Sequence, residues 1–228
     1  MHSLDEIKAQ MLHVCRRIYD REMVASNDGN VTVRVDEQHI LATPSGMSKG
    51  FLTADDLVLT DMRGNPVEKT ERKVTSEIKI YCKIYELRPD VRAAVHAHPI
   101  YATARAAAGL TVNTKVLPES VLSLGEVPLV PYGTPGTDDL AGQVARYLEG
   151  HEVFLLENHG ALALGTNVIE AYHRMECLEH TAKIVHLADS LGGAVTLSPE
   201  RIGGIFEVHG GKTSARIRAA GARMSRPE

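Results

Sequence analysis

No stretch of the sequence reaches the roughly 18 to 20 uninterrupted apolar residues that span a bilayer. The start, MHSLDEIKAQ, also lacks a basic region leading into an apolar run. These absences predict a cytoplasmic protein with no membrane partner. Positive charge is not in excess either, because the formal net charge is -4, which argues against a broad nucleic-acid-binding surface. We therefore expect a small-molecule partner.

Cysteine is sparse. The three cysteines are too few and too scattered for a disulfide framework, and none forms a CxxC pair, so Cys15, Cys82 and Cys177 are expected to be small buried residues. The chain is expected to form one domain, because no internal repeat or low-complexity linker divides it. With 228 residues and 43% hydrophobic content, we expect one domain over residues 1–228 around one core. The stretch from about residue 198 is basic, Gly-rich and weakly periodic, and is predicted to be a mobile tail.

Hydrophobic periodicity predicts alternating helices and strands. Ser3 and Glu6 form a capping box at the start of the first helix. Helices are predicted over residues 4–25, 75–87, 100–108, 138–148 and 168–191. Strands are predicted over residues 30–35, 39–43, 93–98, 153–158 and 161–165. Helices interleaved with hairpin-like strands indicate an α/β fold in which helices cover a mixed sheet.

Three histidines form a candidate metal site. His96 and His98 are two residues apart in a predicted strand, so both imidazoles point to the same face of the sheet. A catalytic zinc site usually takes three protein ligands and keeps a fourth position open. His159 is the leading third ligand, because it ends an apolar strand in a turn before Gly160. An HxH pair alone is a weak signal, since strand histidines often only hydrogen-bond to neighbours.

A second cluster competes with this site. His173, Glu176, Cys177 and His180 share one face of a predicted helix at spacings of three and four, which also suits zinc. The helix is otherwise rich in charge, so a solvated or subunit-contact face is the favoured interpretation.

Glu77 has two interpretations. It follows Thr75 and Ser76 at a predicted helix start, where a carboxylate suits the helix dipole without any further role. Beside a zinc ion, the same carboxylate can ligate the metal and move a proton.

Hydroxyl groups, an amide and flexible backbone suited to a phosphate group occur in three segments, none of which contains a lysine. Each segment taken alone is also a common turn or cap. The segments are Gly29–Asn30, Thr43–Gly46 and Thr75–Ser76.

Five motifs, GNVTVR, TPSGM, TSE, VHAHP and LLENHG, occur in an order and spacing that resemble the class II aldolase and adducin family, most closely the L-fuculose-phosphate aldolase branch. The match runs from about residue 4 to about residue 190. The resemblance implies a central, mainly antiparallel sheet flanked by helical layers. It also implies a fourfold-symmetric homotetramer with active sites at subunit interfaces.

The resemblance further implies roles for particular residues. A zinc ion, or Mn²⁺ or Co²⁺ at the same site, would be bound by Glu77, His96, His98 and His159. The phosphate of dihydroxyacetone phosphate would be held by Asn30, Ser45, Gly46, Thr75 and Ser76. The ion would stabilise an enediolate while a ketose 1-phosphate is cleaved to dihydroxyacetone phosphate and an aldehyde, with Glu77 as the catalytic acid/base.

The sequence departs from that branch at one place. A tyrosine of the neighbouring subunit protonates the aldehyde oxygen in fuculose-phosphate aldolases, and the corresponding position here falls near Leu117. Tyr101, Tyr132 or a C-terminal residue are the alternative donors. The departure predicts a less polar aldehyde, as from a 5-deoxy- or methylthio-ribulose 1-phosphate rather than L-fuculose 1-phosphate.

Three other functions remain open. Ribulose-phosphate 4-epimerases of the family need an acidic residue at a position where this chain has Val121, two residues from Glu119. Decarboxylases of 3-oxo sugar acid phosphates would use the same kind of enediolate. An adducin-like interaction module would need no metal, whereas all four candidate ligands are present here.

Overall fold

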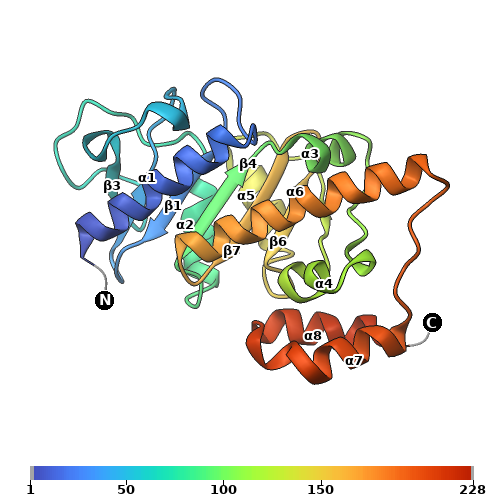
Figure 1. Ribbon diagram of the computed structural model, residues 1–228. Coiled ribbons are helices and arrows are strands. Elements are labelled where there is room, and N and C mark those ends of the chain that lie inside the picture. Colours follow the sequence, from blue (N-terminus) through green and yellow to red (C-terminus); the bar gives the residue numbers. More distant parts are fainter. Residues whose placement is uncertain (1–2, 227–228) are drawn as a thin grey trace.

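The computed structural model describes residues 3–226 and contains a seven-stranded mixed sheet (Figure 1). The strand order is β3-β2-β1-β4-β7-β6-β5, and every neighbouring pair is antiparallel except β5 and β6. The predicted α/β class with a mainly antiparallel sheet is therefore confirmed. The strands are β1 (Asn30–Arg34), β2 (His39–Ala42), β3 (Val58–Asp61), β4 (Ala93–Ala97), β5 (Leu129–Val130), β6 (Val153–Leu156) and β7 (Gly160–Gly165).

Helices cover both faces of the sheet, and each face has its own hydrophobic cluster. The helices are α1 (Leu4–Asp20), α2 (Ile78–Leu87), α3 (Ile100–Ala107), α4 (Pro118–Leu124), α5 (Asp138–Ala145), α6 (Val168–Ser190), α7 (Pro199–His209) and α8 (Ala215–Met224). Helices α1, α3 and α6 bury Met11, Ala102 and Met175 on one face, while α2 and α5 bury Tyr81 and Leu140 on the other. Among the described residues, no helix is long and apolar enough to cross a membrane.

Several predicted boundaries were wrong by a few residues. Helix α1 ends at Asp20, five residues early, because Glu22 adopts a positive φ of 57° that a right-handed helix cannot continue through. Helix α2 begins at Ile78, because Glu77 is itself the N-cap residue, with φ -93° and ψ 14°. The Glu77 side chain does not cap α2, and the Thr75 hydroxyl group accepts from the Glu77 N–H at 3.3 Å just before the helix. Strand β3, the two-residue strand β5 and helix α4 were not predicted; α4 and β5 lie in the stretch that Pro and Gly interrupt.

The residues after Ser198 form a helical hairpin of α7 and α8, which the weak periodicity did not predict (Figure 1). The hairpin packs against α4 through Val121, Ile202 and Met224. Arg216 of α8 also pairs with Asp90 at 2.8 Å, which ties the hairpin to the turn before β4.

Candidate functional site

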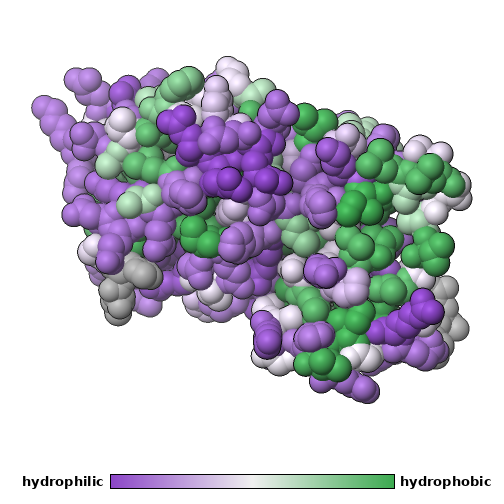
Figure 2. All heavy atoms as spheres, viewed as in Figure 1, coloured by the Kyte–Doolittle hydropathy of each residue, from purple (hydrophilic) through white to green (hydrophobic). Residues whose placement is uncertain are grey.

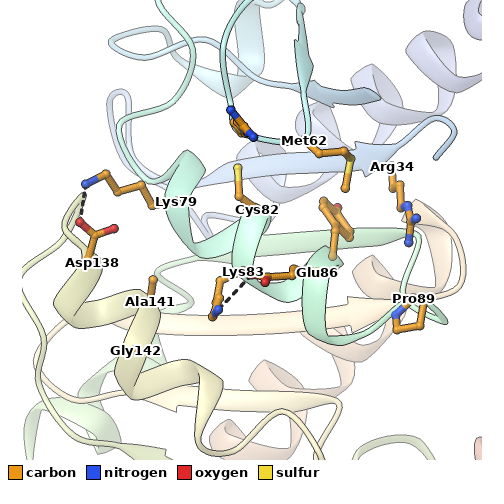
Figure 3. Close-up of a pocket in the computed structure, with 12 residues that line it drawn as sticks. Arg34, Met62, Lys79, Cys82, Lys83, Glu86, Pro89, Asp138, Ala141 and Gly142 are labelled. Atoms are coloured by element: carbon orange, nitrogen blue, oxygen red, sulfur yellow. Dashed lines mark hydrogen bonds and ion pairs between the residues drawn. The ribbon is translucent and has the colours of Figure 1, made fainter. Parts of the chain in front are cut away.

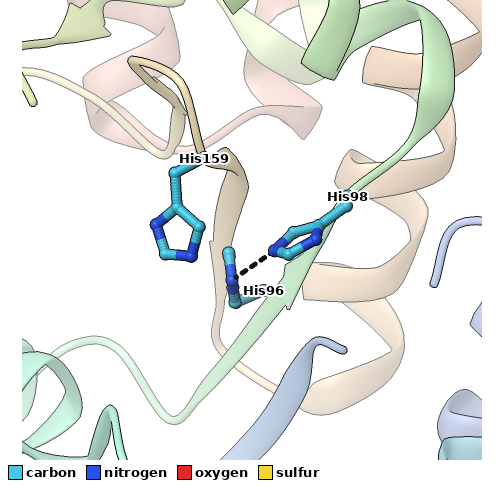
Figure 4. A group of neighbouring side chains, drawn as sticks. All are labelled: His96, His98 and His159. Atoms are coloured by element: carbon cyan, nitrogen blue, oxygen red, sulfur yellow. Dashed lines mark hydrogen bonds between the residues drawn. The ribbon is translucent and has the colours of Figure 1, made fainter. Parts of the chain in front are cut away.

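Two neighbouring strands of the sheet bring the three histidines together (Figure 4). His96 lies in β4, and His98 follows that strand by one residue. His159 lies in the turn between β6 and β7, where its N–H donates to the carbonyl oxygen of Leu156 at 3.0 Å. Gly160 keeps this turn close to β4, since a Cβ atom there would meet His98 Cδ2 at 2.6 Å. The turn predicted to aim His159 at the HxH pair is therefore present.

The ligand atoms have the spacing of a metal centre. The three imidazoles offer nitrogen atoms that all lie within 4.8 Å of one another. His96 Nε2 lies 3.2 Å from His98 Nε2 and 3.4 Å from Glu77 Oε2. His159 Nε2 lies 3.5 Å from Glu77 Oε1. Ligands at roughly 2.0–2.1 Å from a tetrahedral zinc stand about 3.3–3.4 Å apart, so these contacts match the edges of a tetrahedron.

Contacts at the back of two rings turn their other nitrogens toward each other, and the Nε2 atoms of His96 and His98 share a hydrogen bond at 3.2 Å (Figure 4). His96 Nδ1 donates to the Ala161 carbonyl oxygen at 2.9 Å, which leaves Nε2 with its lone pair. His98 Nδ1 faces Asp28 Oδ2 at 3.4 Å, a contact that orients the ring in the same way. Among the described residues, the buried atoms Glu77 Oε1 and His159 Nδ1 have no hydrogen-bond partner. A cation would satisfy the unpaired oxygen, so this residue set fits a divalent metal ion.

Glu77 is aimed at the histidines by a buried chain of polar groups. Its Oε2 accepts from Asn30 Nδ2 at 2.7 Å, and its backbone N–H donates to Thr75 Oγ1 at 3.3 Å. The hydroxyl group of Tyr81 donates to Asn30 Oδ1, which fixes the orientation of that amide. Because the side chain of Glu77 is turned toward the imidazoles, it is more than a carboxylate that suits the helix dipole.

Burial and charge set the protonation states of the centre. Burial would raise the pKa of the Glu77 carboxyl group, but attraction from the imidazoles and the Asn30 amide keep it below its ordinary value. Burial and the neighbouring His96 lower the pKa of His159 to about 4, and the same causes lower the pKa of His98. An ionised Glu77 carboxylate and neutral His98 and His159 imidazoles are the forms that bind metal ions.

A polar cleft of about 190 Å³ opens beside the histidines. All five residues predicted to hold a phosphate group line this cleft. Asn30 and Thr75 are buried, while Ser45, Gly46 and Ser76 are exposed at its rim. The sheet and the start of α2 thus bring together three segments that are far apart in the sequence.

Five residues of this site were missed from the sequence. Asn27, Asp28, Lys49 and Pro135 also line the cleft, and Tyr81 supports it from the core. Tyr81 lies four residues after Glu77, and this spacing on one helix face could have identified it. The other four lie in irregular segments or a single 3-10 turn, whose approach to the histidines only the tertiary structure shows.

The competing cluster on α6 is not a metal site. Glu176 pairs with Arg21 at 2.9 Å and accepts from the Tyr172 hydroxyl group at 2.7 Å. Within residues 3–226, the three histidines of the cleft form the one group with the spacing of metal ligands. The interpretation of this α6 face as a solvated or contact surface agrees with these pairings.

A larger cleft of about 880 Å³ runs along the outer face of α2, away from the histidines (Figure 3). Lys79 pairs there with Asp138 at 2.7 Å, and Lys83 pairs with Glu86 at 2.9 Å. None of the residues predicted for the site is among those that line it. The Lys79 and Lys83 ammonium groups of this cleft are therefore paired with carboxylates.

Comparisons with known proteins identify the family of this chain. Residues 9–186 match the model of the class II aldolase and adducin N-terminal domain. The chain is 35% identical over 182 residues to an L-fuculose phosphate aldolase of Methanococcus maripaludis, covering 80% of this chain and 97% of that protein. It is 32% identical over 181 residues to a 3-oxo-tetronate 4-phosphate decarboxylase of Haemophilus influenzae, covering 78% of this chain and 85% of that protein.

A solved structure of an L-fuculose 1-phosphate aldolase has a TM-score of 0.82 to this chain at 32% identity, covering 91% of this chain and 97% of that one. The fold, the histidine group and the sequence match thus point the same way. The chain belongs to the class II aldolase and adducin family.

Proposed function

We propose that this protein is a zinc-dependent aldolase that reversibly cleaves a ketose 1-phosphate to dihydroxyacetone phosphate and an aldehyde. The observation that carries the proposal is the set of contacts of 3.2–3.5 Å between Glu77, His96, His98 and His159, beside a cleft lined by hydroxyl groups. A bound divalent ion would polarise the oxygens of a hydroxy-ketone and stabilise the negative charge that develops when the carbon–carbon bond breaks.

Glu77 is the proposed proton carrier. In the condensation direction its carboxylate accepts a proton from the hydroxymethyl carbon of dihydroxyacetone phosphate, and in cleavage it returns that proton to the same carbon. The Asn30 amide holds Oε2 at 2.7 Å, while Oε1 is left without a hydrogen-bond partner in the described structure. The hydroxyl groups and backbone of Ser45, Thr75 and Ser76, with Asn30 and Gly46, would bind the phosphate group.

Metal content tests the enzyme against an adducin-like module. Purified protein should contain about one zinc ion per chain, and Glu77→Ala and His159→Ala should each lower that content. Manganese or cobalt at the same site would still support the proposal. A folded protein that binds no divalent metal would overturn it.

The identity of the aldehyde product is a separate part of the proposal. Leu117 is half-buried at the start of α4 and carries no ionisable group. A less polar aldehyde product is therefore proposed, from 5-deoxyribulose 1-phosphate or a methylthio analogue. Release of dihydroxyacetone phosphate from 5-deoxyribulose 1-phosphate and from L-fuculose 1-phosphate can be followed by its reduction with NADH in a coupled assay. A clear preference for L-fuculose 1-phosphate would refute this choice.

A decarboxylase of 3-oxo sugar acid phosphates is the second candidate, favoured by the relative of that activity at 32% identity. It would use the same metal centre and phosphate cleft. Release of carbon dioxide from a 3-oxo acid phosphate, without an aldehyde product, would establish it in place of the aldolase. The epimerase is disfavoured, because Val121 is fully buried under the α7–α8 hairpin and is no substitute for an acidic group.

We also propose a homotetramer with active sites at subunit interfaces. Exposed apolar side chains gather at the α3–α6 end of the molecule (Figure 2), as is typical of contact surfaces. They include Ile100, Leu187 and Leu191, exposed by 58%, 50% and 87%. Light scattering during gel filtration tests the tetramer, and a monomeric active enzyme would refute it.

A further inference from the structure

Lys49 is a buried cation beside the proposed phosphate cleft. It is 2% exposed and lines the cleft together with Asn30, Ser45 and Gly46. Among the described residues that line the cleft, it is the one lysine or arginine. Buried lysines are rare and need partners for their charge, so this position calls for a physical explanation.

The partners of Lys49 are two carbonyl groups from two different loops. Its Nζ donates to Asn27 O at 2.8 Å and to Met47 O at 2.7 Å. Asn27 lies in the loop that leads into β1, and Met47 lies in the loop that follows β2. The ammonium group therefore fastens the two loops to each other.

Both fastened loops turn at a glycine with left-handed backbone. Gly29 has φ +72° and precedes Asn30, while Gly46 has φ +75° and follows Ser45. Each glycine lies within two residues of a carbonyl group bound by Lys49. The distance between Asn30 on one wall of the cleft and Ser45 with Gly46 on the other thus depends on the Lys49 ammonium group.

The charge of the cleft gives Lys49 a second role. Asp28 and Glu77 also line the cleft. Their carboxylates would repel a phosphate ester, which carries about -1.5 to -2 charges at pH 7. A metal ion at the histidines offsets the carboxylate of Glu77 at one end. At the loops, Lys49 is the cation available to offset the phosphate itself.

We propose that Lys49 is a positioning residue for a phosphate-bearing substrate, because its ammonium group sets the spacing of the two loops and supplies positive charge beneath them. This inference rests on the proposed binding of a phosphate ester in the cleft. It predicts selectivity for phosphorylated over unphosphorylated ligands.

Binding measurements test the inference without turnover. Calorimetry on zinc-loaded protein would compare dihydroxyacetone phosphate and inorganic phosphate with unphosphorylated dihydroxyacetone. We expect Lys49→Met to weaken binding of both phosphates about 10- to 100-fold and to leave dihydroxyacetone binding and zinc content within about threefold. Lys49→Arg should weaken phosphate binding less, because it keeps the positive charge. Lys73→Met is the matched control, because Lys73 is exposed and its carbonyl oxygen accepts from the N–H of Ser45, a residue of one fastened loop, at 2.8 Å.

Three results would overturn the inference. They are phosphate binding by Lys49→Met within threefold of the unaltered protein, an equal loss of dihydroxyacetone and phosphate binding, and no phosphate binding by the unaltered protein. If Lys49→Met does not fold, Lys49→Gln and Lys49→Arg replace it, since both can donate to the carbonyl groups but only arginine is charged. Equal phosphate affinity in that pair also overturns the inference. A protein that binds phosphate through Lys49 yet cleaves no ketose phosphate would refute the proposed function alone.

Discussion

Replacing Tyr81 with phenylalanine isolates one hydrogen bond behind the proposed metal centre. Tyr81 is fully buried, and its hydroxyl group donates to Asn30 Oδ1, while Asn30 Nδ2 donates to Glu77 Oε2 at 2.7 Å. Tyr81→Phe leaves the Asn30 oxygen buried without a donor, which costs about 1–3 kcal/mol. The amide is then free to rotate and to turn its oxygen toward the Glu77 carboxylate, where the two would repel.

We expect two measurable effects of Tyr81→Phe. The free energy of unfolding in urea should fall by about 1–3 kcal/mol. Zinc affinity, measured by competition with a chelator, should fall about 10- to 100-fold, as is typical when a group that orients a metal ligand is lost. Circular dichroism should show an unchanged fold.

Tyr85→Phe is the control, because Tyr85 lies one turn further along α2 and is 2% exposed. Its hydroxyl group lies 2.8 Å from Thr32 Oγ1, outside the metal centre. We expect a comparable loss of stability and no change in zinc affinity. The reasoning is refuted if Tyr81→Phe keeps its full zinc affinity, or if Tyr85→Phe loses as much of it.

Three further outcomes follow from the packing. Gly29→Ala should lower the midpoint of thermal unfolding and the zinc content, because φ is +72° and a Cβ atom would lie 2.8 Å from His96 O, a strain of about 1–3 kcal/mol; an unchanged midpoint contradicts this. Glu152→Ala should destabilise the protein by about 1–3 kcal/mol in urea, because it removes a buried charged hydrogen bond of 3.0 Å from Arg88, which keeps its pairing with Asp90; an unchanged free energy of unfolding contradicts this. Burial raises the pKa of Cys82 to about 11, so this half-buried thiol should react with iodoacetamide about a hundredfold more slowly at pH 8 than an ordinary thiol, and the rate should rise up to about pH 11; a plateau near pH 9 would contradict it.

Local sequence patterns predicted much of the fold. Alternation placed β1 and β2 as a hairpin, and periodicity placed α3 and α6 to within about one residue at each end. Their patterns are local, because they depend on which side of one element is buried. The hairpin of α7 and α8 was missed, because its stability comes from contact with Val121 of α4 rather than from its own weak periodicity.

The proposed metal centre was predicted in part from the sequence and in part only from the tertiary structure. The period of a strand is a local property, so the sequence by itself determined that His96 and His98 share one face. Local position also suggested His159 and Glu77, and the family motifs joined all four into one predicted site. Only the tertiary structure decided which of two histidine groups has the spacing of a metal site, because pairing of β4 with β7 brings His159 to the HxH pair while Arg21 occupies Glu176 on α6.

The same holds for the cleft beside the centre. Its hydroxyl-bearing segments were visible in the sequence as turns and caps, but nothing local distinguished Lys49 from a surface lysine. Its burial depends on two loops, before β1 and after β2, which offer it the carbonyl groups of Asn27 and Met47. Contacts between residues distant in the chain carry no periodic signal, and for that reason the structure was needed to reveal them.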